Sequence, residues 1–93
     1  MLFYLVAYDI TDNKRRKKIA DILEGYGPRV QYSVFECVLN PKQYKQLQTR
    51  LKKVFRSEED NLRFYPISDH TLKQVEIWGE GSQLTKPPKS VII

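Results

Sequence analysis

The sequence lacks the residues that build disulfide frameworks, cysteine-based metal clusters and membrane spans. It contains one cysteine, Cys37, and one histidine among 93 residues, which excludes an internal disulfide and a cluster of cysteine ligands. Cys37 lies in an apolar run, where a buried thiol is expected rather than a nucleophile. The apolar run Leu2–Ala7 is far too short to cross a bilayer, and no signal peptide is visible. We therefore expect a protein of the reducing cytoplasm that has no membrane partner.

Several enzyme motifs are missing as well. The sequence has no nucleophile elbow, no phosphate-binding loop and no zinc-ligand spacing. The single histidine, His70, lies in a polar turn. The glycine-rich and aromatic signature of RNA-recognition sheets is also absent.

Positive charge is what the sequence has in excess. Lysine and arginine number 16 and aspartate and glutamate 11, which gives a net charge of +5. This balance favours polyanionic partners such as nucleic acid, although solubility alone also accounts for it. A chain of 93 residues makes one domain with a modest core, and such chains often gain stability by forming oligomers.

The first part of the chain predicts a strand followed by a helix. Leu2–Tyr8 is continuously apolar apart from its tyrosine hydroxyls, which is typical of a central strand covered on both faces. Thr11 or Asp12 caps the next helix through a side-chain oxygen. Apolar residues then recur at helical spacing, and the glycines and proline at 25–28 end the helix.

The rest of the chain predicts three further strands and a second helix. Residues 29–39 are rich in β-branched and aromatic residues, and this long strand is expected to bend, bulge or split near Tyr32-Ser33. Asn40 followed by Pro41 marks the start of the second helix. An acidic surface turn is expected at 57–60, and the last strands at 62–67 and 74–78.

This order of elements predicts an α+β fold, a ferredoxin-like plait. Its sheet is mainly antiparallel, with two helices on one face. We assign residues 1–79 to this domain and residues 80–93 to a C-terminal arm and strand. The apolar end at 91–93 either folds back on its own sheet edge or adds a strand to a second subunit. The proline-stiffened arm favours exchange of this strand in a homodimer.

The sharpest candidate for chemistry is Asp9, a carboxylate that directly follows the first strand. Carboxylate oxygens suit Mg²⁺ or Mn²⁺, whereas a capping or salt-bridged aspartate is the structural alternative. Asp12 is expected to cap the helix. Metal-dependent phosphodiester cleavage usually draws on more than one carboxylate, and a twofold dimer would bring two copies of Asp9 together.

Consecutive cations follow at Lys14–Lys18. On a helical wheel, Arg15 and Arg16 extend the inner stripe toward the end of the first strand, and the lysines project to solvent. Five cations in the first turns oppose the helix dipole, which indicates a function in phosphate binding. The alternative is a solvated basic face with Arg15 or Arg16 paired to Asp9 or Asp12.

Several motifs occur in order along nearly the whole chain: Tyr8-Asp9-Ile10-x-Asp12, Arg15-Arg16, Gly27-x-Arg29-Val30-Gln31-x-Ser33-Val34-Phe35-Glu36 and Tyr65-Pro66-Ile67. Together, and at this chain length, they resemble the small CRISPR-associated metal-dependent endonuclease family. This family provides the smaller of the two core proteins of the spacer-acquisition machinery.

The resemblance implies a ferredoxin-like homodimer in which Asp9 of both subunits holds a divalent metal. It also implies cleavage of single-stranded RNA or double-stranded DNA, and a scaffold role between dimers of the larger CRISPR integrase. The family's other functional positions fall on four residues: Tyr8 at the strand end, Arg16 in the basic turn, and Arg29 and Phe35 in the second strand.

From these observations we predict a Mg²⁺- or Mn²⁺-dependent endonuclease. Asp9 is its catalytic and metal-binding residue, and its nucleic-acid-binding residues are Tyr8, Arg15, Arg16, Arg29 and Phe35. The alternatives are a non-catalytic DNA-binding scaffold and a toxin-like RNA-cleaving protein of the same fold. A regulatory domain for small molecules is less compatible with the basic first turn.

Overall fold

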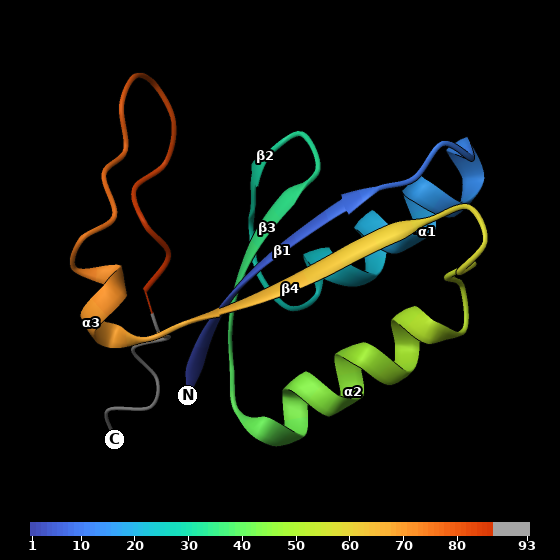
Figure 1. The fold of residues 1–93 in the computed structure, drawn as a ribbon, viewed down its shortest axis with the longest axis horizontal. Coiled ribbons are helices and arrows are strands. Elements are labelled where there is room, and N and C mark those ends of the chain that lie inside the picture. The colour runs from blue at the N-terminus through green and yellow to red at the C-terminus, as the bar shows by residue number, and fades with distance from the viewer. Residues whose placement is uncertain (87–93) are drawn as a thin grey trace.

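The four strands form one antiparallel sheet in the order β2-β3-β1-β4 (Figure 1). The structure, a computed structural model, describes residues 1–86. Its elements are β1 (Leu2–Asp9), α1 (Asn13–Glu24), β2 (Arg29–Gln31), β3 (Val34–Leu39), α2 (Pro41–Lys52), β4 (Asn61–Ile67) and the short α3 (Asp69–Leu72). This strand order, with α1 and α2 as crossing helices, makes the predicted ferredoxin-like plait.

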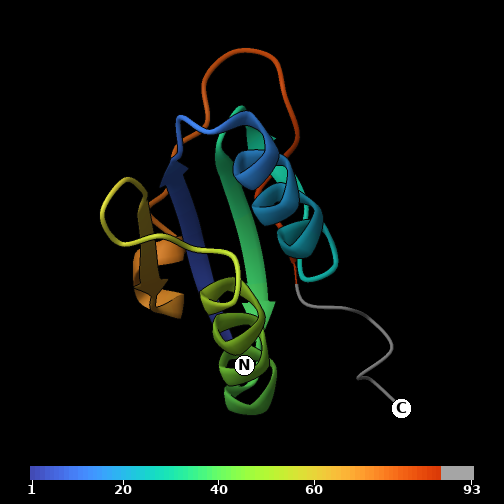
Figure 2. The ribbon, with the colours of Figure 1, turned by 90° about the vertical axis from the view of Figure 1, so that its right-hand side faces the viewer.

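Helices α1 and α2 cover one face of the sheet. Alternate residues of a strand share a face, and those of β1 and β3 that face the helices join them in one buried cluster. The cluster contains Tyr4, Val6, Tyr8, Ile19, Ala20, Leu23, Phe35, Cys37, Leu39, Leu47 and Leu51. Residues 69–86 lie on the opposite side of the sheet (Figures 1 and 2). We call the face turned away from α1 and α2 the outer face.

Both long helices begin where the sequence predicts. The carboxylate of Asp12 accepts a hydrogen bond from the backbone nitrogen of Arg15 at 2.8 Å, so Asp12 is the N-cap of α1. Asn40 and Gln43 form a reciprocal capping box at the start of α2. These caps satisfy backbone donors that the first turn of a helix leaves free.

The predicted long strand is split, as expected, at Tyr32-Ser33. Its two parts, β2 and β3, form an antiparallel hairpin with an irregular register between Arg29 and Gln31. Tyr8 donates a backbone hydrogen bond to the carbonyl of Ser33 at 3.1 Å. The tip of the hairpin therefore lies beside the end of β1.

One local prediction is wrong, and a second needs correction at one residue. Residues 74–78 form no strand; they follow α3 as a turn and an irregular segment, and Val75, Ile77 and Trp78 are exposed. A strand needs a neighbouring strand to pair with, and residues 1–86 supply none here: the backbone nitrogens of Gln74 and Val75 donate to Thr71 and Leu72 instead. The predicted surface turn at 57–60 is present and exposed at residues 57–59, whereas the Asp60 side chain is 0% exposed.

The C-terminal predictions are only partly covered by the described residues. Residues 79–81 bend, and Gly79 and Gly81 have φ values of 87° and 135°, which favour glycine. The backbone nitrogen of Thr85 donates a hydrogen bond to the carboxylate oxygen Oε1 of Glu36 at 3.0 Å, so this segment returns to the sheet. The predicted strand exchange by 91–93 lies outside the described residues. Within residues 1–86 no helix has both the length and the apolar character that crossing a membrane requires.

Candidate nucleic-acid interface

Asp9 is the last residue of β1 and is exposed. It lies directly opposite Asn61 of β4. Its carboxylate takes part in no ion pair or hydrogen bond with another residue of 1–86. It borders an open depression of about 430 Å³, whose other lining residues are Tyr8, Ile10, Thr11, Arg16, Tyr32 and Ser33. This carboxylate is accessible and pairs with no cation of the described chain, so it is available to a metal ion.

The donor chemistry of Asp9 fits Mg²⁺ or Mn²⁺, but one carboxylate is an incomplete site. These cations prefer hard oxygen ligands and retain water molecules. Among residues 1–86, no group of three or more histidine, cysteine, aspartate or glutamate side chains is placed to hold a metal ion. The remaining ligands would have to be water, phosphate oxygens or the carboxylate of a second chain.

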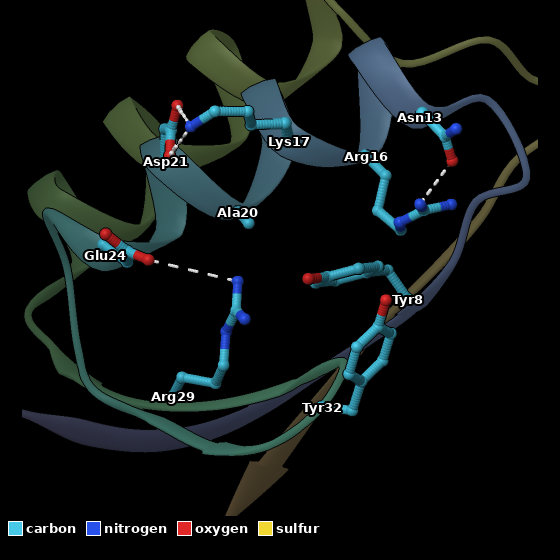
Figure 3. A pocket seen from close by; sticks show the side chains of 9 residues that line it. All are labelled: Tyr8, Asn13, Arg16, Lys17, Ala20, Asp21, Glu24, Arg29 and Tyr32. Carbon is cyan, nitrogen blue, oxygen red and sulfur yellow. Dashed lines mark hydrogen bonds and ion pairs between the residues drawn. The ribbon is translucent and has the colours of Figure 1, made fainter.

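A second depression, of about 380 Å³, lies between α1 and β2. It shares Tyr8, Arg16 and Tyr32 with the depression beside Asp9. Figure 3 shows the hydroxyl of Tyr8 directed into this space between Arg16 and Arg29. Burial raises the pKa of Tyr8, so the hydroxyl stays protonated at neutral pH and is available as a hydrogen-bond donor. Together the two depressions form a continuous polar surface around the end of β1.

Arg16 is fixed beside the end of β1 by its own hydrogen bonds. Its Nη1 donates to the carbonyl oxygens of Ile10 at 2.9 Å and Thr11 at 3.3 Å. Its Nη2 donates to the amide oxygen of Asn13. No carboxylate of residues 1–86 pairs with this guanidinium, so its positive charge is not neutralised within the described chain. Arg16 and Asp9 thus border the same depression.

Arg29 lies on the other side of the second depression. Its guanidinium lies 5.3 Å from the centroid of the Phe35 ring, and its Nη2 is 3.9 Å from Glu24 Oε1. Phe35 is 0% exposed. The prediction that Phe35 contacts nucleic acid therefore needs correction: the ring is a core residue that supports Arg29, and it has no free face on which a base could stack.

Arg15 points away from this surface toward the start of β4. Its Nε and Nη2 each lie 2.9 Å from the carboxylate of Asp60, and Nη2 is 3.2 Å from Glu59. Hydrogen bonds from Arg15 hold the pKa of Asp60 below its ordinary value. Arg15 is 14% exposed, and the ion pair fixes the first turn of α1 to the loop before β4. Its predicted phosphate contact stays a prediction.

Sequence reasoning missed Tyr32 and Asp60. Tyr32 is 75% exposed at the hairpin tip and lines both depressions. The aromatic residue beside a predicted break was the available signal. Asp60 gave no such signal, because its partner Arg15 is distant in sequence and only the fold brings the two together.

Other cations lie between α1 and the end of α2. They surround a further depression of about 390 Å³ lined by Asp12, Lys14, Arg15, Lys18, Lys53, Val54 and Arg56. Among the residues described, Lys14, Lys18, Lys53 and Arg56 have no ion-pair partner. The basic surface therefore extends from the first turn of α1 to the loop after α2.

The fold and these residues define a class of small α+β plait proteins with an accessible carboxylate at the end of the first strand and a basic helix behind it. The family model described as CRISPR associated protein Cas2 matches residues 1–75, and the chain belongs to this family.

Individual relatives are similar to this protein in sequence or structure over most of its length. The CRISPR-associated endoribonuclease Cas2 3 of Synechocystis is 64% identical over 93 residues and covers 100% of both chains. The crystal structure of Streptococcus pyogenes Cas2 has a TM-score of 0.74 at 33% identity and covers 83% of this chain and 99% of that one. A chain of a partial Cas6-RT-Cas1–Cas2 complex has a TM-score of 0.75 at 37% identity, covering 83% and 90%.

Proposed function

We propose that the protein is a dimeric, Mg²⁺- or Mn²⁺-dependent endonuclease that acts on RNA or double-stranded DNA in CRISPR spacer acquisition. The observation that carries this proposal is the exposed Asp9 carboxylate, which pairs with no cation of residues 1–86 and borders the same depression as Arg16. The endoribonuclease name of the Synechocystis relative supports a nuclease activity.

In this proposal Asp9 holds the divalent metal, which when bound supplies an activated water and charge stabilisation at the phosphate. Arg16 and Arg29 bind phosphate oxygens through charge-assisted hydrogen bonds. Tyr8 donates a hydrogen bond to a phosphate oxygen through its protonated hydroxyl. Phe35 acts only indirectly, by supporting the guanidinium of Arg29.

A second copy of the chain would complete this site. Two Asp9 carboxylates that meet across a twofold axis repel each other unless a cation lies between them. The exposed apolar residues Val75, Ile77 and Trp78 give such a dimer surface to bury. The solved complex whose title names Cas1 together with Cas2 supports the larger integrase as a further partner.

The test is cleavage of single-stranded RNA and duplex DNA by the wild type and by Asp9→Asn, with Mg²⁺ or Mn²⁺ and after chelation. Asn is nearly isosteric with Asp but lacks the charge that neutralises a cation. We expect the substitution to abolish metal-dependent cleavage and to leave folding and metal-free binding intact. Asp69→Asn is the matched control, since it removes an exposed carboxylate in the first turn of α3. Undiminished cleavage by Asp9→Asn would exclude the catalytic role.

The second candidate is a non-catalytic scaffold that binds DNA for the integrase. The incomplete carboxylate set around Asp9 and the broad basic surface favour it. A wild-type protein that binds duplex DNA and the integrase but cleaves neither nucleic acid with any divalent metal would select the scaffold.

A further inference from the structure

The outer face of the sheet carries a cation that the functional site described so far does not include. Arg63 of β4 lies directly opposite Ala7 of β1, and Asn61 lies opposite Asp9. Residues directly opposite in adjacent strands share a face, as do alternate residues of one strand. Arg63 and Asp9 are therefore diagonal neighbours on the outer face. Diagonal neighbours are typically about 7–8 Å apart, within reach of a long side chain.

The guanidinium of Arg63 is held in place by neutral groups. Its Nε donates to Asn61 Oδ1 at 3.0 Å, and its Nη1 donates to the hydroxyl of Tyr65 at 3.2 Å. Both partners belong to the same strand and the same face. An arginine carries five N–H donors, so donors remain free for a ligand after these bonds are made.

The positive charge of Arg63 is uncompensated in the part of the chain that the structure describes. Arg15 pairs with Asp60, Lys17 with Asp21 and Arg29 with Glu24, whereas no carboxylate of residues 1–86 pairs with Arg63. A charged residue on an edge strand can simply prevent edge-to-edge pairing. That role does not require a guanidinium fixed at two points beside a carboxylate that has no partner within residues 1–86.

We propose that Arg63 is a phosphate-binding residue that holds the nucleic-acid phosphodiester beside Asp9 on the outer face. This inference rests on the proposed nuclease function and adds a residue to its site. The planar guanidinium matches two phosphate oxygens at once. Its charge also lowers the cost of the negative charge that develops during phosphoryl transfer. The substrate would then be held by Arg16 at the end of β1 and by Arg63 on the outer face.

The experiment compares Arg63→Gln and Arg63→Lys with the wild type. The matched control is Arg50→Gln, because Arg50 is also an exposed arginine that donates to a tyrosine hydroxyl, that of Tyr26 at 3.4 Å. Binding of single-stranded RNA and duplex DNA is measured in chelator over a range of salt. Cleavage is measured with Mn²⁺, thermal unfolding reports folding, and sedimentation reports the oligomeric state.

We expect Arg63→Gln to lower the salt slope of binding by about one per chain and to reduce kcat/KM about tenfold or more. Arg63→Lys should retain the slope but recover only part of the cleavage, since lysine lacks the planar fork. Arg50→Gln should change neither quantity.

If Arg63→Gln shows the same salt slope of binding and the same cleavage rate as Arg50→Gln, the inference about Arg63 is overturned. The proposed Asp9-dependent cleavage would not be affected by that result. If the wild type binds nucleic acid without cleaving it, the salt slope of Arg63→Gln alone tests whether Arg63 binds phosphate. A wild type that does neither overturns this inference together with the proposed function. If Arg63→Gln does not fold, Arg63→Lys decides, and full cleavage by that variant rejects the proposed role.

Discussion

Gly27 is the position at which the smallest change should damage the fold most. A Cβ atom added there would lie 2.1 Å from the carbonyl oxygen of Glu36 and 2.9 Å from the Cα of Cys37. Both are backbone atoms of β3, which lies between β1 and β2 in the sheet, so no side-chain rotation relieves the contact. Overpacking typically costs about 1–3 kcal/mol, and the rigid neighbours place Gly27→Ala near the upper value.

The matched control is Gly25→Ala. A Cβ at Gly25 would meet only the carbonyl oxygen of Ile22 at 3.3 Å, and its φ of −74° and ψ of −8° suit alanine. We expect this change to alter stability by less than about 1 kcal/mol.

Thermal unfolding at one fixed protein concentration measures both variants. A loss of about 3 kcal/mol corresponds to a fall in Tm of roughly 12–24 °C for a domain of this size. If Gly27→Ala and Gly25→Ala have the same Tm, the turn at 25–28 does not pack against β3 as described. Because Arg29 follows this turn directly, loss of the packing should also weaken nucleic-acid binding.

Two further predictions separate stability from binding. Arg16→Ala should lower the salt slope of nucleic-acid binding by about one. Arg15→Ala should mainly lower Tm, because it leaves the buried Asp60 unpaired. The reverse pattern would contradict our conclusion that Arg16 faces the nucleic-acid interface and Arg15 faces Asp60. Asp60 has a folded-state pKa below its ordinary value of 3.8, so its contribution to stability is present above that pH and is lost as the pH falls through the folded pKa. Denaturant unfolding from pH 6 down to about pH 2 should therefore show a weaker acid dependence for Asp60→Asn than for the wild type, and equal slopes would speak against the ion pair.

Local sequence signals predicted much of the fold because they act over a few residues. Asp12 and Asn40 cap their helices through side-chain oxygens only three residues from the backbone nitrogens that they bind. The break at Tyr32-Ser33 and the burial of Phe3, Tyr4, Val6 and Tyr8 likewise follow from local composition.

The errors came from contacts between distant parts of the chain. The pattern at 74–78 suits a strand, but strand formation depends on a neighbour that residues 1–86 do not supply. Phe35 has the chemistry of a base-stacking residue, yet its register places it against α1 and α2. Asp60 was predicted to lie in a surface turn, because its partner Arg15 is distant in sequence and only the fold brings the two together. For the candidate site, the sequence predicted Asp9 and Arg16 as functional residues, and these stay predictions. The strand register was needed to place Arg63 on the same face as Asp9.

The most direct test of the proposed metal site is titration of the wild type and Asp9→Asn with Mn²⁺ in the absence of nucleic acid, followed calorimetrically. If Asp9 of two chains holds one cation, the wild type should bind one Mn²⁺ per two chains, and Asp9→Asn should lose this binding while remaining folded and dimeric. Equal Mn²⁺ affinity and stoichiometry in the two proteins would contradict the assignment of Asp9 as the metal-binding residue.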